Sequence, residues 1–189
     1  MSSLDRDANV LGALALVVAD QTSAAIAAAS GQSVSGAAAL SALHQFLDRP
    51  SLDRLRRVLG LTPSGAVRLV DRLVASGLVT RGPGTDGRSR SLVLTPQGRR
   101  AAERIVAARA NALRELLQRL SPEQRAALSA LLDALMEGAV AGKDGGAWIC
   151  RLCDLGACKR DEGRCPAANA AAAAKYGSSN SRGGSAGWS

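Results

Sequence analysis

The stretch from Leu52 to Thr95 constrains the fold most, because helix-forming and turn-forming residues alternate there at short spacings. Ser51 is predicted to cap a short helix that ends at Gly60. Thr62 followed by a proline is a start signal for a second helix, expected from Ser64 to about Ser76. Two helices joined by so short a turn form the helix-turn-helix pattern.

The second of these helices has one apolar and one polar side. Its spacing places Ser64, Arg68 and Arg72 on the outside. The expected inner stripe consists of Ala66, Val67, Val70, Leu73 and Val74. A β-hairpin should follow, because the β-prone runs 78–81 and 91–94 flank a turn-rich segment that carries Arg88 near its tip. We call this hairpin the wing.

In this order the segments resemble the MarR (multiple antibiotic resistance regulator) family of winged helix-turn-helix transcriptional regulators. The matching residues are 68–73 in the second helix, 77–81 entering the wing, 86–88 at its tip and 94–98 leaving it. The resemblance extends from Asn9 to about Val140. It implies a mainly α fold with a small β-hairpin wing, in which the winged helix-turn-helix region, residues 34–95, is flanked by N- and C-terminal dimerisation helices, residues 9–30 and 96–141.

The positive charge of the chain is concentrated on this region. Between Arg49 and Arg104 there are twelve arginines and four acidic residues, a net charge of +8. The remaining residues carry twelve basic and twelve acidic side chains, which cancel. A local excess of arginine is typical of a surface that neutralises phosphates, and we favour this interpretation over a merely solvated charged face.

The expected partner is therefore double-stranded DNA. The second helix would enter the major groove, where Ser64, Arg68 and Arg72 reach bases and phosphates, while Arg88, oriented by Asp86, contacts the neighbouring minor groove or its backbone. The predicted DNA-binding residues are Thr62, Ser64, Arg68, Arg72, Arg81, Asp86, Arg88 and Arg90.

Helical stripes of Ala, Leu and Val lie on both sides of the winged region. Residues 1–8 are expected to be disordered, and helices are expected over 9–30, 34–47, from 96 to Leu120, and from Pro122 onward. In the second of these, the inward residues should be Leu40, Leu43, Phe46 and Leu47. We predict a homodimer on a palindromic operator rather than a monomeric bundle, because two half-sites about 34 Å apart double the contacts.

The only histidine, His44, lies in the predicted helix 34–47. It is expected to be a packed or solvent-facing residue. A role in a small-molecule effector pocket or a metal site is the alternative, but a metal site needs further ligands at suitable spacing.

A linker, residues 142–149, precedes the only four cysteines, Cys150, Cys153, Cys158 and Cys165. Their C-x2-C-x4-C-x6-C spacing favours a zinc ion or an iron–sulfur cluster within residues 150–166, because a reducing cytoplasm disfavours permanent disulfides. Reversible disulfide sensing and an incidental cluster remain alternatives. Residues 167–189 should be an Ala-rich, partly helical run and then a Gly/Ser-rich disordered tail.

These features predict a sequence-specific regulator, most simply a repressor, that responds to a redox or metal signal or to a small organic ligand. A sequence-neutral architectural DNA-binding protein is the alternative. A thiol oxidoreductase using Cys150 and Cys153 is disfavoured because no βαβ alternation accompanies the motif, so the chain is not expected to be an enzyme. No uninterrupted apolar run reaches the roughly 20 residues that span a bilayer, so we expect a cytoplasmic protein without membrane contact.

Overall fold

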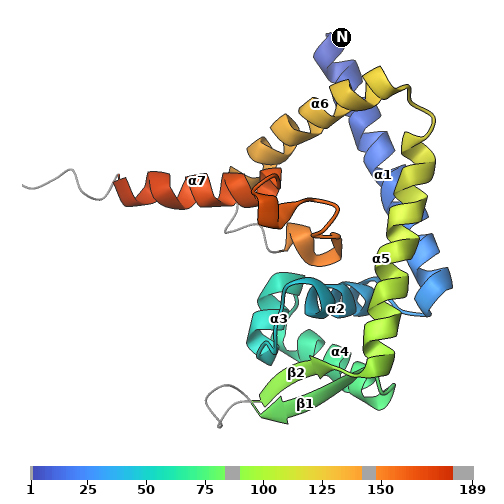
Figure 1. Cartoon of the computed structure of the whole chain (residues 1–189), viewed down its shortest axis with the longest axis vertical. Coiled ribbons are helices and arrows are strands. Elements are labelled where there is room, and N and C mark those ends of the chain that lie inside the picture. Colours follow the sequence, from blue (N-terminus) through green and yellow to red (C-terminus); the bar gives the residue numbers. More distant parts are fainter. Residues whose placement is uncertain (1, 84–89, 142–147, 181–189) are drawn as a thin grey trace, which may run out of the picture. The chain divides into compact units, whose positions relative to one another are not determined.

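The computed structural model describes residues 2–83, 90–141 and 148–180. The chain divides into two compact units, residues 1–119 and 120–189. The first contains α1 (Ser3–Ser30), α2 (Val34–Gln45), α3 (Leu52–Leu59), α4 (Pro63–Ala75), β1 (Val79–Pro83), β2 (Arg90–Leu94) and α5 (Pro96–Leu117) (Figure 1). The second contains α6 (Pro122–Ala141), two 3-10 turns (Ile149–Leu152 and Arg160–Glu162) and α7 (Pro166–Asn180).

Side-chain caps fix where the helices of the winged region begin. Ser51, Thr62 and Thr95 each accept a hydrogen bond from the backbone N–H three residues later, at 2.9–3.2 Å. α4 and α5 have proline in the first turn, and Gly60 ends α3 with a φ of 65°. The predicted mainly α fold with a hairpin wing is therefore confirmed, and its start signals are local side-chain contacts.

Helix α2 is the centre of the core of the first unit. Ala37, Ala39, Leu40 and Ala42 are 0% exposed, and α2 packs against α1, α3, α4, α5 and β2. Leu47 is buried as expected, but Leu43 and Phe46 are only half-buried. The prediction of an inward Leu/Phe stripe was wrong in this respect, because a helix surrounded by neighbours buries its alanines on every side, and small residues let those neighbours approach closely.

The wing is a two-stranded antiparallel hairpin in which Val79 pairs with Leu94 and Pro83 with Arg90. Its second strand gains a further backbone partner, since Leu92 N–H donates to the Pro50 carbonyl at 2.9 Å. The tip, residues 84–89, which carries the predicted contacts Asp86 and Arg88, lies outside the described residues.

The wing, α4 and α5 meet at Thr95 and Gly98. Thr95 N–H donates to the Leu78 carbonyl at 3.1 Å, and Thr95 Oγ1 donates to the Gly77 carbonyl at 2.7 Å. A Cβ built on Gly98 would lie 1.9 Å from the Leu78 oxygen. Glycine is therefore required at this position, because no side chain fits between the first turn of α5 and the residues that follow α4.

Three boundaries differ from the sequence expectations. α1 begins at Ser3 rather than Asn9, because Ser2 and Asp5 form a reciprocal capping box that starts the helix within the predicted disordered segment. α6 groups with the cysteine segment rather than with residues 9–119. α7 carries the Ala-rich run and continues to Asn180.

Helix α1 is, among the described helices, the one long and apolar enough to cross a membrane. Its most apolar window has a mean hydropathy of 1.7 and is 6% buried. The expectation that no uninterrupted apolar run of this length exists still holds, because Asp20 and its polar neighbours interrupt the apolar residues of α1. Helices of soluble proteins meet the same criteria of length and composition, which makes this feature weak evidence for a membrane span.

Candidate nucleic-acid interface

Helix α4 presents a polar, arginine-bearing face outward. Thr62, Ser64, Arg68 and Arg72 are all exposed. The opposite face is held in the core by Ala66, Leu69, Val70 and Leu73, each at most 2% exposed. Because this stripe is anchored by apolar burial, the arginines are presented by a helix that is rigidly oriented in its domain.

One residue of the predicted inner stripe faces the other way. Val67 is 41% exposed, and Leu69 takes the inward position that the sequence analysis gave to Val67. The helical period explains the error. Residues 66, 69, 70 and 73 lie on one side of a helix with 3.6 residues per turn, whereas residue 67 lies about 100° around the helix from residue 66. Val67 therefore adds an apolar side chain to the outer face, suited to contact with a thymine methyl group.

The arginines of this face differ in their partners. Arg81 Nη2 on β1 lies 2.6 Å from Asp71 Oδ1 on α4, an ion pair with both side chains partly exposed. Within the described part of the chain, the side chains of Arg68 and Arg72 have no hydrogen-bond or ion-pair partner. Asp71 thus orients the Arg81 guanidinium against α4, while Arg68 and Arg72 keep their donors available for a ligand. Asp71 was not among the predicted site residues.

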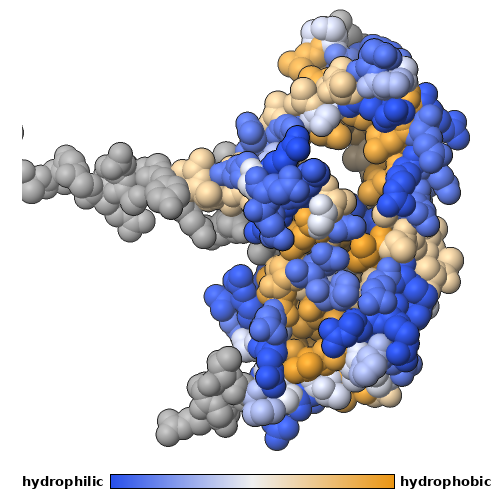
Figure 2. All heavy atoms as spheres, viewed as in Figure 1, coloured by the Kyte–Doolittle hydropathy of each residue, from blue (hydrophilic) through white to orange (hydrophobic). Residues whose placement is uncertain are grey.

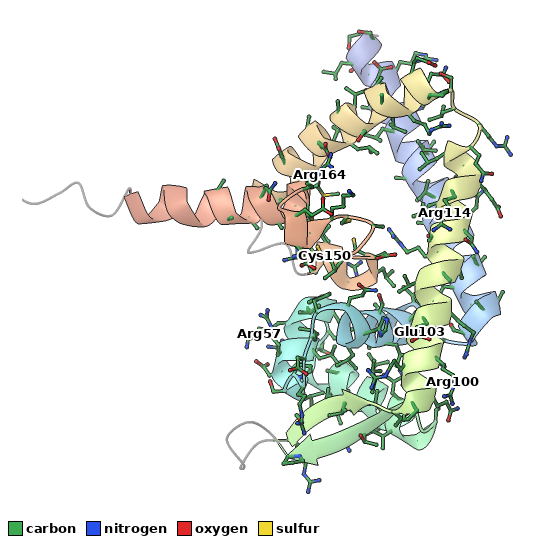
Figure 3. All side chains as sticks on the ribbon, viewed as in Figure 1. Arg57, Arg100, Glu103, Arg114, Cys150 and Arg164 are labelled. Carbon is green, nitrogen blue, oxygen red and sulfur yellow. The ribbon has the colours of Figure 1, made fainter. Side chains whose placement is uncertain are left out.

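Helix α3 adds positive charge beside α4. Asp53 pairs with Arg56 at 2.9 Å and with Arg57 at 3.1 Å, and the hydrogen bond from Arg56 lowers the pKa of the Asp53 carboxyl. Figure 3 shows Arg57 on the outer side of α3, pointing away from the domain. One carboxylate shared by two arginines leaves a net positive helix surface. This surface was covered by the regional charge count but not by the residue predictions.

The predicted contacts in the described residues are thus brought to one domain. Thr62, Ser64, Arg68 and Arg72 lie on α4 or at its cap, and the exposed Arg81 and Arg90 lie on the two wing strands. In Figure 2 hydrophilic residues lie along the outer edges of this region, and hydrophobic residues are visible between them. A helix and a hairpin that both carry exposed arginines on one compact domain match a surface that contacts both bases and phosphates.

Comparison with known proteins shows which family this domain resembles. Residues 35–89 match the sequence model described as the MarR family. The chain carries a MarR-family winged helix-turn-helix domain. Members of this family are transcription regulators rather than enzymes, which confirms the expectation that the chain is not an enzyme. None of the curated proteins matches the chain significantly.

Solved MarR-family structures share the fold. Rv1404 of Mycobacterium tuberculosis is 24% identical with a TM-score of 0.63, over 74% of this chain and 95% of that one. Rv2887 of the same organism, solved in complex with DNA, is 25% identical with a TM-score of 0.55, over 68% and 95% of the two chains. Wild-type MarR of E. coli is 23% identical with a TM-score of 0.54, over 66% and 96%. Rv2887 has also been solved in complex with p-aminosalicylic acid.

A groove of about 510 Å³ runs between α1 and α5 of the first unit. Its lining combines alanines with the polar side chains of Gln21, Asn111, Glu115 and Arg119. His44, half-buried on α2, is not part of the lining. This groove, rather than a site at His44, is a hollow of the described residues large enough for a small polar organic molecule.

The four cysteines all lie in the second unit. Cys150 and Cys165 are buried and Cys153 and Cys158 are half-buried. A hydrogen bond with the Cys153 thiol, followed by the charge of Arg160, lowers the pKa of Cys150 to about 6. In the described residues, no three His, Cys, Asp or Glu side chains are already set to hold a metal ion. The zinc or iron–sulfur assignment therefore stays a prediction.

Proposed function

We propose that the protein binds a specific palindromic operator as a homodimer and represses transcription from it. The observation that carries the proposal is the outer face of α4, where Arg68 and Arg72 are exposed and unpaired among the described residues of a MarR-family domain. A DNA-binding transcriptional regulator is the function common to that family. Rv2887, which is similar over two thirds of this chain, has been solved in complex with DNA.

The mechanism follows from the placement of the arginines. With α4 in the major groove, Arg68 and Arg72 would donate two parallel hydrogen bonds to guanine edges or to phosphate oxygens, and Val67 would contact a thymine methyl group. Arg81, held by Asp71, and Arg90 would contact the backbone beside the groove. A regulator placed across a promoter in this way excludes the polymerase, which is the simplest route to repression.

The exposed apolar face of α1 supports dimerisation. Leu4, Val10, Leu11, Leu14, Leu16 and Val17 are each between 46% and 74% exposed. Figure 2 shows hydrophobic residues at the surface where α1 and α5 lie side by side. A patch of this kind marks an interface, and a second copy of the chain is the partner that a symmetric operator requires. If α1 forms a dimer interface, it need not cross a membrane, and we propose that the protein is cytoplasmic.

Two routes for a signal fit the structure. A small organic ligand would occupy the groove between α1 and α5, where Arg119 and Glu115 offer charge of both signs. A metal or redox signal would act on the cysteine segment. Either would work by changing the geometry of the dimer helices, to which the DNA-binding domain is attached.

Operator selection tests the central part of this proposal. Full-length protein would be used to enrich duplexes from a random library, and the enriched site would compete against its scrambled version at physiological salt. We expect an inverted repeat and a preference of about a thousandfold or more. Equal affinity for both duplexes would instead identify a sequence-neutral architectural protein.

Sedimentation tests the dimer. At micromolar concentration the wild type should sediment at twice the chain mass, and Leu14→Glu should shift it toward the monomer, because a charge would be buried in an apolar interface. Asp7→Glu, an exposed conservative change on the same helix, is the matched control. A monomeric wild type that still binds the inverted repeat would contradict the homodimer.

A further inference from the structure

The cysteine segment lacks the apolar core that orders a domain. In the described part of residues 120–189, the buried positions are Val140, Cys150, Cys165 and Ala167. Two of the four are therefore thiols. Three large apolar residues of α6, Leu131, Leu132 and Leu135, are exposed. Segments this small usually need a cross-link or a metal to hold one structure.

Three of the four thiols lie near one another. The Cys153 and Cys165 thiols lie close enough to Cys150 to lower the pKa of its thiol, although Cys165 lies fifteen residues away in sequence. A disulfide would join Cys150 to only one of these two neighbours. A shared ion or cluster, by contrast, binds all of its sulfur ligands at once.

Two tight turns hold the cysteines in place. Cys153 N–H donates to the Cys150 carbonyl at 2.9 Å, which closes the C-x-x-C turn. In the second turn Lys159, directly after Cys158, adopts a φ of 50°, which is rare for a residue other than glycine. Arg164 N–H donates to the Lys159 carbonyl at 3.1 Å just before Cys165. Backbone strain beside a set of potential ligands is typical of a functional site.

A cation lies beside the Cys150 sulfur, and two more lie in the same segment. Arg160 Nη1 is 3.4 Å from Cys150 Sγ. Arg151 stacks over the Trp148 ring at 5.6 Å and donates to the Trp148 carbonyl. Figure 3 shows Arg164 in the same small segment as Cys150. Four thiolates around a divalent ion leave two net negative charges, and neighbouring guanidinium groups offset that excess.

We propose that Cys150, Cys153, Cys158 and Cys165 together bind one thiophilic metal centre, a zinc ion or an iron–sulfur cluster. Because the described thiols are not yet set as ligands, binding would draw them closer together. Cys165 precedes α7, Asn169 N–H donates to the Cys165 carbonyl at 3.0 Å, and α7 packs on α6. The metal would therefore order the start of α7 against α6. This site does not depend on the DNA-binding function proposed above.

Metal analysis of the full chain tests the proposal. The protein would be purified without oxygen, its visible spectrum recorded, and its zinc and iron measured per chain. A colourless protein with one zinc would support the zinc form, and visible thiolate-to-iron absorption with iron and sulfide would support the cluster. Metal-free protein, whether its thiols are reduced or in disulfides, would overturn the proposal.

Matched variants locate the metal. Cys150→Ser, Cys165→Ser and the fourfold Cys→Ser variant should lose it, while Ala157→Ser, an exposed change between Cys153 and Cys158, should retain it. Because misfolding of a Cys variant would also abolish metal binding, a mercurial thiol reagent would also be titrated into the wild type. Release of the metal should be complete at four equivalents. Metal retained by the fourfold variant, or released without reaction of the thiols, would overturn the proposal.

Discussion

The DNA-binding region, taken here as α2 to α5, and the second unit, residues 120–189 with the cysteine segment, use apolar residues in opposite ways. In the first, Leu40, Leu55 and Ile105 are at most 1% exposed. In the second, Leu131, Leu132 and Leu135 are 51–62% exposed. The first region is stabilised by its own apolar core. In the second region large apolar residues are exposed, where a partner could cover them, and two of the buried residues are cysteines. The burial of apolar residues, rather than their number, therefore distinguishes a region that folds alone from one that folds with a ligand or a second chain.

The largest effect should come from truncating the central helix. Leu40→Ala removes a side chain that is 0% exposed on α2 and should lower the free energy of unfolding by about 2–5 kcal/mol. Denaturant unfolding followed by circular dichroism would measure it.

Leu131→Ala on α6 is the matched control. The same truncation at an exposed position should change the unfolding of the DNA-binding region by less than about 0.5 kcal/mol. Equal losses in the two variants would remove the distinction between the regions.

The two regions should also respond differently to a methyl group on glycine. Gly98→Ala drives a Cβ to 1.9 Å from the Leu78 oxygen, which forces the backbone apart and should cost about 1–3 kcal/mol. Gly138→Ala, within α6, has no neighbour within 4 Å and should instead favour the helix by up to about 1 kcal/mol. Thermal unfolding of the two variants gives the sign of each change. Stabilisation by Gly98→Ala would show that α5 does not dock as described.

The smallest effect concerns a hydroxyl group. Ser41 Oγ on α2 is buried and has no hydrogen-bond partner among the described residues. Ser41→Ala should therefore raise the free energy of unfolding by about 1 kcal/mol, because the desolvated hydroxyl is removed. Ser129→Ala, at an exposed site on α6, should change little, and calorimetry of both would show whether the effect is specific to the core. A loss of stability in Ser41→Ala would mean that the hydroxyl has a partner.

Local interactions made much of the fold predictable. The starts of three helices were predictable from Ser51, Thr62 and Thr95, because an N-cap side chain bonds to a backbone group only three residues away. Gly60 ends α3 for an equally local reason. The exposed face of α4 followed from helical periodicity at Arg68 and Arg72, whereas Val67 was misplaced because a stripe of small apolar residues leaves its edge ambiguous.

Contacts between distant residues were not predictable. Asp71 on α4 and Arg81 on β1 form an ion pair although they are ten residues apart, and the sequence around either residue does not predict this pair. The need for glycine at Gly98 depends on where Leu78 lies after folding. Likewise, the cysteine spacing predicted a shared site, but only the folded segment shows Arg160 next to Cys150.

The account rests above all on α4 as the DNA-contacting helix. The affinities of Arg68→Ala, Arg72→Ala and Arg114→Ala for the selected operator, measured at one salt concentration, test this directly. Arg114 is an exposed arginine on α5, so its loss removes the same charge outside the winged region (Figure 3). The account predicts a loss of about 1–3 kcal/mol for Arg68→Ala and Arg72→Ala but little change for Arg114→Ala. Wild-type affinity in all three variants, with the dimer intact, would contradict it.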